Sequence, residues 1–313
     1  MRHKRLGDSD LSVSVIGLGT WAMGGDYWGA SDDDASVAAI RRSLDMGVNL
    51  IDTAPGYGRG LSEELVGRAI KGYARDKVVI ATKCGIVWGE GRRWCDQSGW
   101  SIKEEVELSL KRLSTDHIDL YQMHWPDPHT PIAESVAALM DLKREGKIRY
   151  MGVSNFSAEQ MGEARKYGEV TSLQPQYSLL CRKEQANVDY CGANGIGTLS
   201  YGSLGSGILS GKFRERPTLG EGDKRGEFYK FFDEPIFGKC MELVEVLRGI
   251  AEGRGKPVGH VAINWVNQRP GITCALVGAR TAAQAEENAL SGEWELSPDE
   301  IGTIDGAYGR IFE

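Results

Sequence analysis

The chain has 313 residues, of which 41% are hydrophobic and 26% charged, so it can bury a large core. Its formal net charge of -7 and isoelectric point near 5.4 argue against nucleic acid or an anionic membrane as the main partner. Anionic small molecules stay open as partners, because a few local cations can outweigh a distant net charge.

The sequence also gives no sign of a membrane or secreted protein. No apolar run approaches the roughly 20 residues that span a bilayer, and the basic start lacks the apolar stretch of a signal peptide. Cysteines occur at positions 84, 95, 181, 191, 240 and 274, without C-x-x-C spacing. We therefore expect reduced thiols in a cytoplasmic protein and no structural zinc site.

Short apolar runs typical of strands alternate with segments of helical periodicity along most of the chain. The first dozen residues differ, because apolar and polar residues alternate on both sides of residues 7–10. This pattern predicts an added hairpin. Eight strand-like runs then follow, at residues 13–17, 49–52, 78–82, 118–123, 150–153, 172–174, 197–200 and 273–277. Helix starts between them are indicated by Ser31, Ser101, Thr130, Ser157 and Thr281.

This alternation predicts an α/β fold with a parallel sheet, and eight units favour a closed (β/α)8 TIM barrel over an open sheet. The hairpin would plug the amino-terminal end of the barrel. Two extra helices exceed a minimal barrel, one over residues 237–251 and one in the tail from Ser297. No shift in composition marks a boundary, so residues 1–313 are expected to form a single domain.

Four polar side chains come at or just after the ends of three successive strands. Asp52 and Tyr57 follow the second strand, Lys83 the third and His124 the fourth. Taken singly, Asp52, Tyr57 and Lys83 are most simply a turn residue, a half-buried aromatic and a solvated lysine. In a parallel barrel, however, these strand ends converge on one mouth, where active sites lie. The set therefore predicts a proton-transfer site.

The chemistry of such a site follows from its residue types. Asp52 is a natural counter-ion for Lys83, which would be costly to bury alone. A free tyrosine has a pKa of about 10, and a neighbouring ammonium is expected to lower it. Tyr57 would then act as general acid toward a substrate oxygen and as base in reverse, while His124 donates a hydrogen bond to the same oxygen.

With Gly152-Val-Ser-Asn-Phe156 and Tyr201-Gly-Ser-Leu-Gly-Ser-Gly207, these residues make the chain resemble a bacterial aldo-keto reductase over essentially its whole length. The resemblance implies a catalytic tetrad of Asp52, Tyr57, Lys83 and His124. It also implies that Ser154, Asn155 and Gln174 hold the carboxamide of the nicotinamide. Tyr201 would stack on the nicotinamide ring.

The resemblance further suggests where the phosphates of the cofactor bind. Backbone N–H groups around Leu204 and Ser206 would cradle the pyrophosphate, and Lys212 and Arg225 would close over it. For either cation the simpler interpretation is a solvated loop charge.

The start of the last barrel helix is a further expected anion site. Arg280, after Gly278, would pair with the adenosine 2′-phosphate. The residues near the adenine would be Gln284, Glu287 and Asn288, although Gln284 also fits as the capping partner of Thr281. This locus favours NADPH over NADH.

Three other motifs are rejected. Residues 17–22 fit the G-x-G-x-x-A spelling of a Rossmann fingerprint, but no helix follows at once. Residues 205–212 resemble a P-loop only superficially. Residues 124–129 contain two histidines without metal-ligand spacing, so no metal is expected.

Tryptophans are frequent in the expected loops at the mouth, and we expect Trp21 and Trp125 to form an aromatic substrate pocket. The sequence thus predicts NADPH-dependent, reversible reduction of a small carbonyl substrate. The alternative is a non-catalytic nicotinamide-binding subunit of the potassium-channel β type, which the motifs alone do not separate from an enzyme. Substrate identity and oligomeric state are left open.

Overall fold

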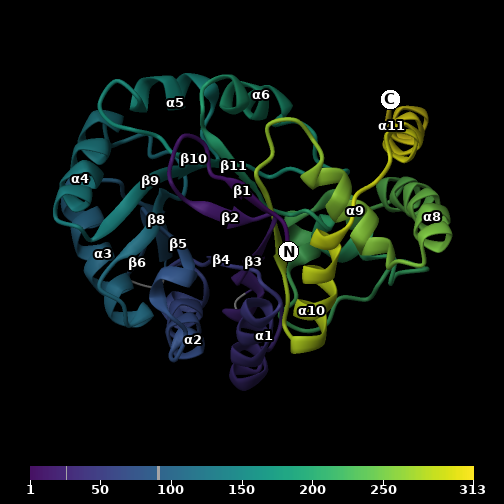
Figure 1. Ribbon diagram of the computed structural model, residues 1–313, viewed down its shortest axis with the longest axis horizontal. Helices are drawn as coiled ribbons and strands as arrows, with labels where there is room; N and C mark the ends of the chain where they lie inside the picture. The colour runs from purple at the N-terminus through teal and green to yellow at the C-terminus, as the bar shows by residue number, and fades with distance from the viewer. Residues whose placement is uncertain (26, 90–91) are drawn as a thin grey trace.

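The computed structural model describes residues 1–25, 27–89 and 92–313, and its eight parallel strands close into a barrel surrounded by helices (Figure 1). This confirms the predicted (β/α)8 barrel. In chain order the barrel strands are β3 (Ile16–Gly19), β4 (Leu50–Asp52), β5 (Val79–Cys84), β8 (Ile118–Met123), β9 (Ile148–Ser154), β10 (Ser172–Gln174), β11 (Gly197–Ser200) and β12 (Cys274–Gly278).

The first barrel strand lies further along the chain than predicted. Of the expected run 13–17, the first part belongs to the hairpin, in which β1 (His3–Arg5) pairs antiparallel with β2 (Ser12–Ser14). The barrel strand starts only at Ile16 and pairs with β4 and β12. Because one apolar run continues from hairpin to barrel, the sequence offers no boundary between them.

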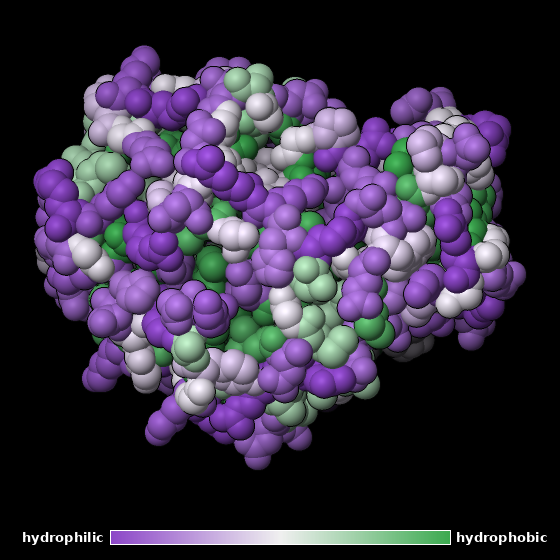
Figure 2. Space-filling view, viewed as in Figure 1, coloured by the Kyte–Doolittle hydropathy of each residue, from purple (hydrophilic) through white to green (hydrophobic). Residues whose placement is uncertain are grey.

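The hairpin plugs the barrel, as expected. Leu6, Leu11 and Val13 are buried and pack with barrel residues including Leu50 and Leu199. Figure 1 shows the hairpin lying across the ring of strands. The same face is mostly hydrophilic, with apolar side chains visible in gaps (Figure 2). This end of the barrel is therefore closed by apolar packing, which leaves the opposite end for the site.

In the described ranges, eight helices form the outer ring of the barrel, one for each strand. They are α1 (Asp33–Asp45), α2 (Leu61–Ile70), α3 (Gly99–Leu113), α4 (Ile132–Arg144), α5 (Ala158–Ala164), α6 (Gln185–Ala193), α9 (Val258–Asn267) and α10 (Ala282–Leu290). Short 3-10 turns lie at η1 (Trp21–Met23), η2 (Gly58–Gly60), η3 (Arg75–Lys77), η4 (Gly205–Ser210), η5 (Lys230–Phe232) and η6 (Ser291–Glu293).

Two of the five predicted helix caps are correct. Ser157 forms a complete capping box with Gln160, and Thr281 accepts a hydrogen bond from the backbone of Gln284. The other three helices start at different residues. The side chains of Asp32 and Ser98 cap two of them, and the third has no side-chain cap. The observed N-caps there are Asp32, Ser98 and Pro131.

The two predicted extra helices are α8 (Ile236–Arg254) and α11 (Pro298–Phe312), which lie together at one side of the ring (Figure 1). Asp305 fixes α11 to α9, because it accepts hydrogen bonds from the Trp265 indole at 3.0 Å and from Arg269 at 2.8 Å. A one-turn helix, α7 (Arg225–Phe228), and a hairpin of β6 (Ile86–Gly89) and β7 (Arg92–Cys95) were not predicted.

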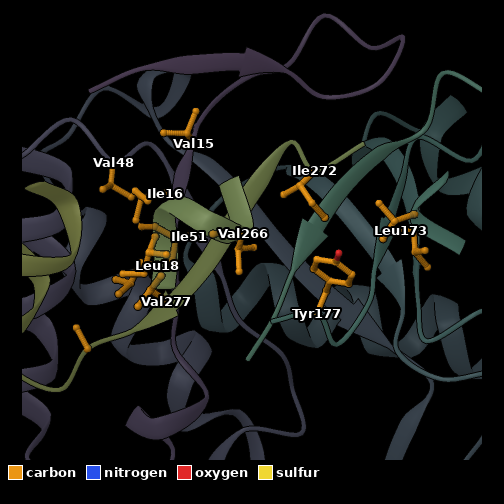
Figure 3. Close-up of a cluster of buried hydrophobic side chains, with 14 of the residues drawn as sticks. Val15, Ile16, Leu18, Val48, Ile51, Leu173, Tyr177, Val266, Ile272 and Val277 are labelled. Atoms are coloured by element: carbon orange, nitrogen blue, oxygen red, sulfur yellow. The ribbon is translucent and has the colours of Figure 1, made fainter. Parts of the chain in front are cut away.

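A second apolar layer lies between the strands and the helices. Figure 3 shows part of it, where Ile16 and Leu18 of β3 meet Ile51 of β4 and Val277 of β12. Side chains alternate along each strand, so one set faces this layer and the other faces the barrel interior. None of the helices in the described ranges is long and apolar enough to cross a membrane.

The plug makes a direct contribution to stability that can be measured. Leu6→Ala should lower the free energy of unfolding by about 2–5 kcal/mol, because it leaves a cavity under the barrel. Ser12→Ala, on the exposed face of the same hairpin, is the matched control and should change little. Urea unfolding followed by tryptophan fluorescence measures both. Equal stability of the two variants would contradict a plug that supports the barrel.

Candidate active site

The four predicted residues converge at the carboxyl end of the barrel. Asp52 ends β4, Lys83 is the fifth residue of β5, and His124 directly follows β8. Tyr57 lies in the loop after β4, immediately before η2. The β4–β5 pairing sets Asp52 opposite Ala81, so Lys83 lies further along β5 toward the mouth.

Close approach of two loops fixes Tyr57. Gly58 has a φ of 62°, and a Cβ on it would lie 2.5 Å from the carbonyl oxygen of Gly24. Only glycine fits such a contact without moving the loop. The ring of Trp21 lies beside Tyr57, with 6.2 Å between ring centroids.

The ammonium of Lys83 is completely buried and connects the other groups. Its Nζ donates to both carboxylate oxygens of Asp52, at 2.8 and 2.9 Å, and to the carbonyl oxygen of Thr53 at 2.9 Å. It also lies 3.0 Å from the hydroxyl oxygen of Tyr57. All of its hydrogen-bonding capacity is therefore used by this site.

The expected direction of the Tyr57 pKa shift is wrong. Removal from bulk water raises the pKa of Tyr57 well above its ordinary value, and the negative charge of Asp52 raises it further. Lys83 does not reverse this, because its charge is balanced by Asp52 at salt-bridge distance. Burial also lowers the pKa of Lys83, and Asp52 opposes that change. Tyr57 is thus a protonated phenol at neutral pH.

His124 is a neutral imidazole at neutral pH. Burial lowers its pKa well below 6.5, and the positive charges of Lys83 and Arg93 lower it further. Its ring meets that of Tyr57 edge-on, at 5.9 Å between centroids. A neutral imidazole keeps one N–H, so this ring can donate a hydrogen bond beside the Tyr57 hydroxyl.

The predicted carboxamide-binding residues form a hydrogen-bonded group next to these four. Gln174 donates to Asp52 at 2.7 Å, and Ser154 donates to the carbonyl oxygen of Gln174 at 2.9 Å. Asn155 donates to the carbonyl oxygen of His124 at 3.0 Å and accepts from the Tyr201 hydroxyl at 2.9 Å. These bonds connect the carboxyl ends of β4, β8, β9, β10 and β11 at the mouth of the barrel.

One cavity of about 1030 Å³ brings nearly all the predicted site residues together. Lys83 does not line it, because it lies beneath Tyr57 and Asp52. The cavity is lined by the remaining predicted residues, Trp21, Asp52, Tyr57, His124, Trp125, Ser154, Asn155, Gln174, Tyr201, Leu204, Ser206, Lys212, Arg225, Gly278, Arg280, Gln284, Glu287 and Asn288.

One part of this cavity fits an anion. Ser206 and Gly207 in η4 have left-handed backbones, with φ of 57° and 95°. A Cβ on Gly207 would lie 3.4 Å from Arg225 Nη1 and 3.5 Å from Lys212 Nζ, so two cations face bare backbone. Arg225 is held by Asp223 at 2.6 Å and by the carbonyl oxygen of Ser206 at 2.9 Å. Burial and the charge of Arg225 lower the pKa of Lys212.

Arg280 stands at the start of α10 and is tied to another loop. Its guanidinium donates to the carbonyl oxygens of Trp28, at 3.2 Å, and of Ala30. The side chain of Gln284 accepts from the Arg280 backbone N–H at 2.8 Å and makes no bond to the backbone of Thr281, so the expected capping box is only half formed.

Two groups of cavity residues lie outside the predicted set of site residues. Tyr27 and Trp28 meet the segment around Asp223 through a β-bridge, and Tyr27 packs edge-on against Phe228 at 5.2 Å. The β6–β7 hairpin, expected as loop, contributes four further residues, Ile86, Arg93, Trp94 and Cys95. The adjacent aromatic pair at 27–28 was the available signal for the first group.

The tryptophans expected at the mouth differ in whether they line the cavity. Trp21 and Trp125 line the cavity as predicted, whereas Trp100 belongs to α3 and is 74% exposed. No group of three or more histidine, cysteine or carboxylate side chains in the described ranges is arranged to hold a metal ion.

Comparison with known proteins assigns nearly the whole chain to one family. The sequence profile of the aldo/keto reductase family matches residues 15–308. The chain is 44% identical to the aldo-keto reductase YhdN of Bacillus subtilis (strain 168) over 96% of its own length and 91% of that protein. It is 36% identical to the NADH-specific methylglyoxal reductase of Escherichia coli (strain K12), over 95% of each chain.

Solved structures agree. The fold matches the glycerol dehydrogenase AKR11B4 of Gluconobacter oxydans with a TM-score of 0.91 and 39% identity, covering 99% of this chain and 96% of that one. Aldo-keto reductases use nicotinamide cofactors and act on small carbonyl compounds. The chain belongs to the aldo/keto reductase family and is an oxidoreductase that acts on carbonyl and alcohol groups.

Proposed function

We propose that this protein reversibly reduces aldehydes or ketones to alcohols with NADPH, using Tyr57 as the proton donor. The observation that carries the proposal is the contact between the Lys83 ammonium and the Tyr57 hydroxyl, at 3.0 Å, beside a cavity that also holds an anion-binding region. Tyr57 and His124 are the catalytic residues of this proposal. Lys83 and Asp52 act through Tyr57.

The bound nicotinamide supplies the hydride that reduces the carbonyl carbon. Tyr57 is protonated before the reaction because burial raises its pKa. The substrate alkoxide that develops is a stronger base than a phenolate, so Tyr57 can still protonate it. Lys83, at 3.0 Å, then stabilises the tyrosinate, and in the oxidation direction the proton returns by the same route.

His124 and the surrounding walls orient the substrate. A neutral imidazole donates one hydrogen bond to the carbonyl oxygen and leaves proton transfer to Tyr57. Trp21 and Trp125 form part of an aromatic wall around that oxygen. Desolvation by this wall strengthens both polar interactions.

The preference for NADPH rests on the cations at the other end of the cavity. Lys212, Arg225 and Arg280 all line it, and the charges of the two arginines both lower the pKa of Lys212. Three cations within Coulombic range suit a cofactor with an additional phosphate. The NADH-specific E. coli relative, at 36% identity, makes cofactor choice a property to be measured in this chain.

Tyr57→Phe should lower kcat for aldehyde reduction by about 10²- to 10⁴-fold, the usual contribution of a general acid. Cofactor affinity, measured by quenching of tryptophan fluorescence, should be unchanged, since the phenyl ring is kept. Tyr73→Phe, in which a half-buried tyrosine bonded to Asp45 is altered, is the matched control. Full turnover in Tyr57→Phe would exclude Tyr57 as the acid.

Asp52→Asn should lower the free energy of unfolding by about 3–5 kcal/mol, because it leaves the ammonium of Lys83 buried without a counter-ion. Asp76→Asn removes an exposed partner of Lys77 and should have almost no effect. The double variant Asp52→Asn/Lys83→Met should recover part of the loss in urea unfolding. A double variant no more stable than Asp52→Asn would argue against an uncompensated charge.

Arg280→Gln should weaken NADPH binding at least about tenfold, as expected for loss of a charge-assisted contact, and leave NADH binding nearly unchanged. Arg280→Lys should recover part of the affinity. Dissociation constants for both cofactors measure this difference. Equal losses for NADPH and NADH would indicate that Arg280 only holds the backbone of Trp28 and Ala30.

A further inference from the structure

The β6–β7 hairpin brings a cation to the end of the cavity that holds Tyr57 and His124. Arg93 of β7 lines the cavity with both residues. It pairs in register with Trp88 of β6, and its guanidinium carbon lies 5.7 Å from the centroid of the Tyr27 ring. This cation is separate from the anion-binding region formed by η4, Lys212 and Arg225.

The positive charge of Arg93 is less compensated than that of Arg225, which also lines the cavity. Asp223 lies 2.6 Å from Arg225, whereas no carboxylate in the described ranges lies within 4.0 Å of the Arg93 guanidinium. Its charge reaches the proposed catalytic centre, because it is one of the cations that lower the pKa of His124. The charge of Arg93 therefore acts on a group bound beside Tyr57 and His124.

The walls near Arg93 are mainly aromatic. Tyr27, Trp94, Trp125 and Phe228 line the same cavity, so an apolar body can lie between the carbonyl group and the guanidinium. A planar guanidinium with several N–H donors matches a carboxylate in two parallel hydrogen bonds. Neither a neutral alkyl chain nor a second cation could accept these hydrogen bonds from the guanidinium.

We propose that Arg93 binds a carboxylate on the substrate, so that the preferred substrates are aldehydes or ketones carrying a carboxylate beyond an apolar or aromatic spacer. The proposal rests on the carbonyl reductase activity proposed above and specifies its substrate class. Arg93 is a specificity-determining residue in this scheme and takes no part in hydride or proton transfer.

The neighbouring arginine provides a matched control. Arg92 directly precedes Arg93 in β7 and carries the same charge. Its guanidinium lies over the Trp94 ring at 5.8 Å, and it does not line the cavity. Both arginines are exposed, so replacing either one should leave the fold intact.

The test compares 4-formylbenzoate with its neutral isostere 4-formylbenzamide as substrates of the wild type, Arg93→Gln, Arg93→Lys and Arg92→Gln. The two aldehydes differ in intrinsic reactivity, but that difference cancels when each variant is compared with the wild type. In Arg93→Gln, kcat/KM for the carboxylate should fall about tenfold or more, as for a lost charge-assisted hydrogen bond, and that for the amide should stay within about twofold. Arg93→Lys should retain an intermediate preference, and Arg92→Gln should behave as the wild type.

Three outcomes would overturn the proposal. The first is an equal change for both aldehydes in Arg93→Gln, and the second is the same loss in Arg92→Gln, which would indicate only long-range charge. The third is weaker NADPH binding by Arg93→Gln, which would assign the cation to the cofactor. Failure of the proposed function has a different signature, because the wild type would then oxidise NADPH with neither aldehyde.

Discussion

A buried ammonium requires a buried counter-charge, and this requirement organises the mouth of the barrel. Lys83 is buried completely, and Asp52 on the neighbouring strand meets it with both carboxylate oxygens. The remaining capacity of Nζ is used by Thr53 and Tyr57. Because the strands fix the first pair and the pair fixes the hydroxyl, the proposed proton donor is oriented by the barrel itself.

The same pairing explains why Tyr57 is a protonated phenol and not a tyrosinate. An isolated ammonium would favour the charged phenolate, but Asp52 cancels most of that field. Burial then dominates and raises the pKa of the phenol. The residue types predicted which groups would meet, whereas the sign of the shift depended on three distances and on solvent access, which a sequence does not contain.

Fold and site were predictable to different degrees. Strand ends place Asp52, Lys83 and His124 at one mouth because parallel strands share a direction, and the alternation alone gave the barrel. Helix starts were less predictable where a nearby group competes: the Ser31 hydroxyl donates to the carbonyl oxygen of Met23, and Asp32 caps the helix instead. The β6–β7 hairpin lacks a clear alternating pattern, so the sequence does not predict it.

The cavity also shows why the acidic composition did not decide the class of ligand. The chain carries a net charge of -7, yet cations line both ends of the cavity, Lys212 and Arg280 at one and Arg93 at the other. Charges at the surface are screened within roughly 10 Å at ordinary salt, whereas those lining a low-dielectric cavity act on a ligand nearly undiminished. The nicotinamide cofactor and the proposed carboxylate-bearing substrate would therefore both meet a locally positive site in an acidic protein. Between these ends lies the balanced Lys83–Asp52 pair, so in the proposed reaction the carbonyl group would meet neutral donors.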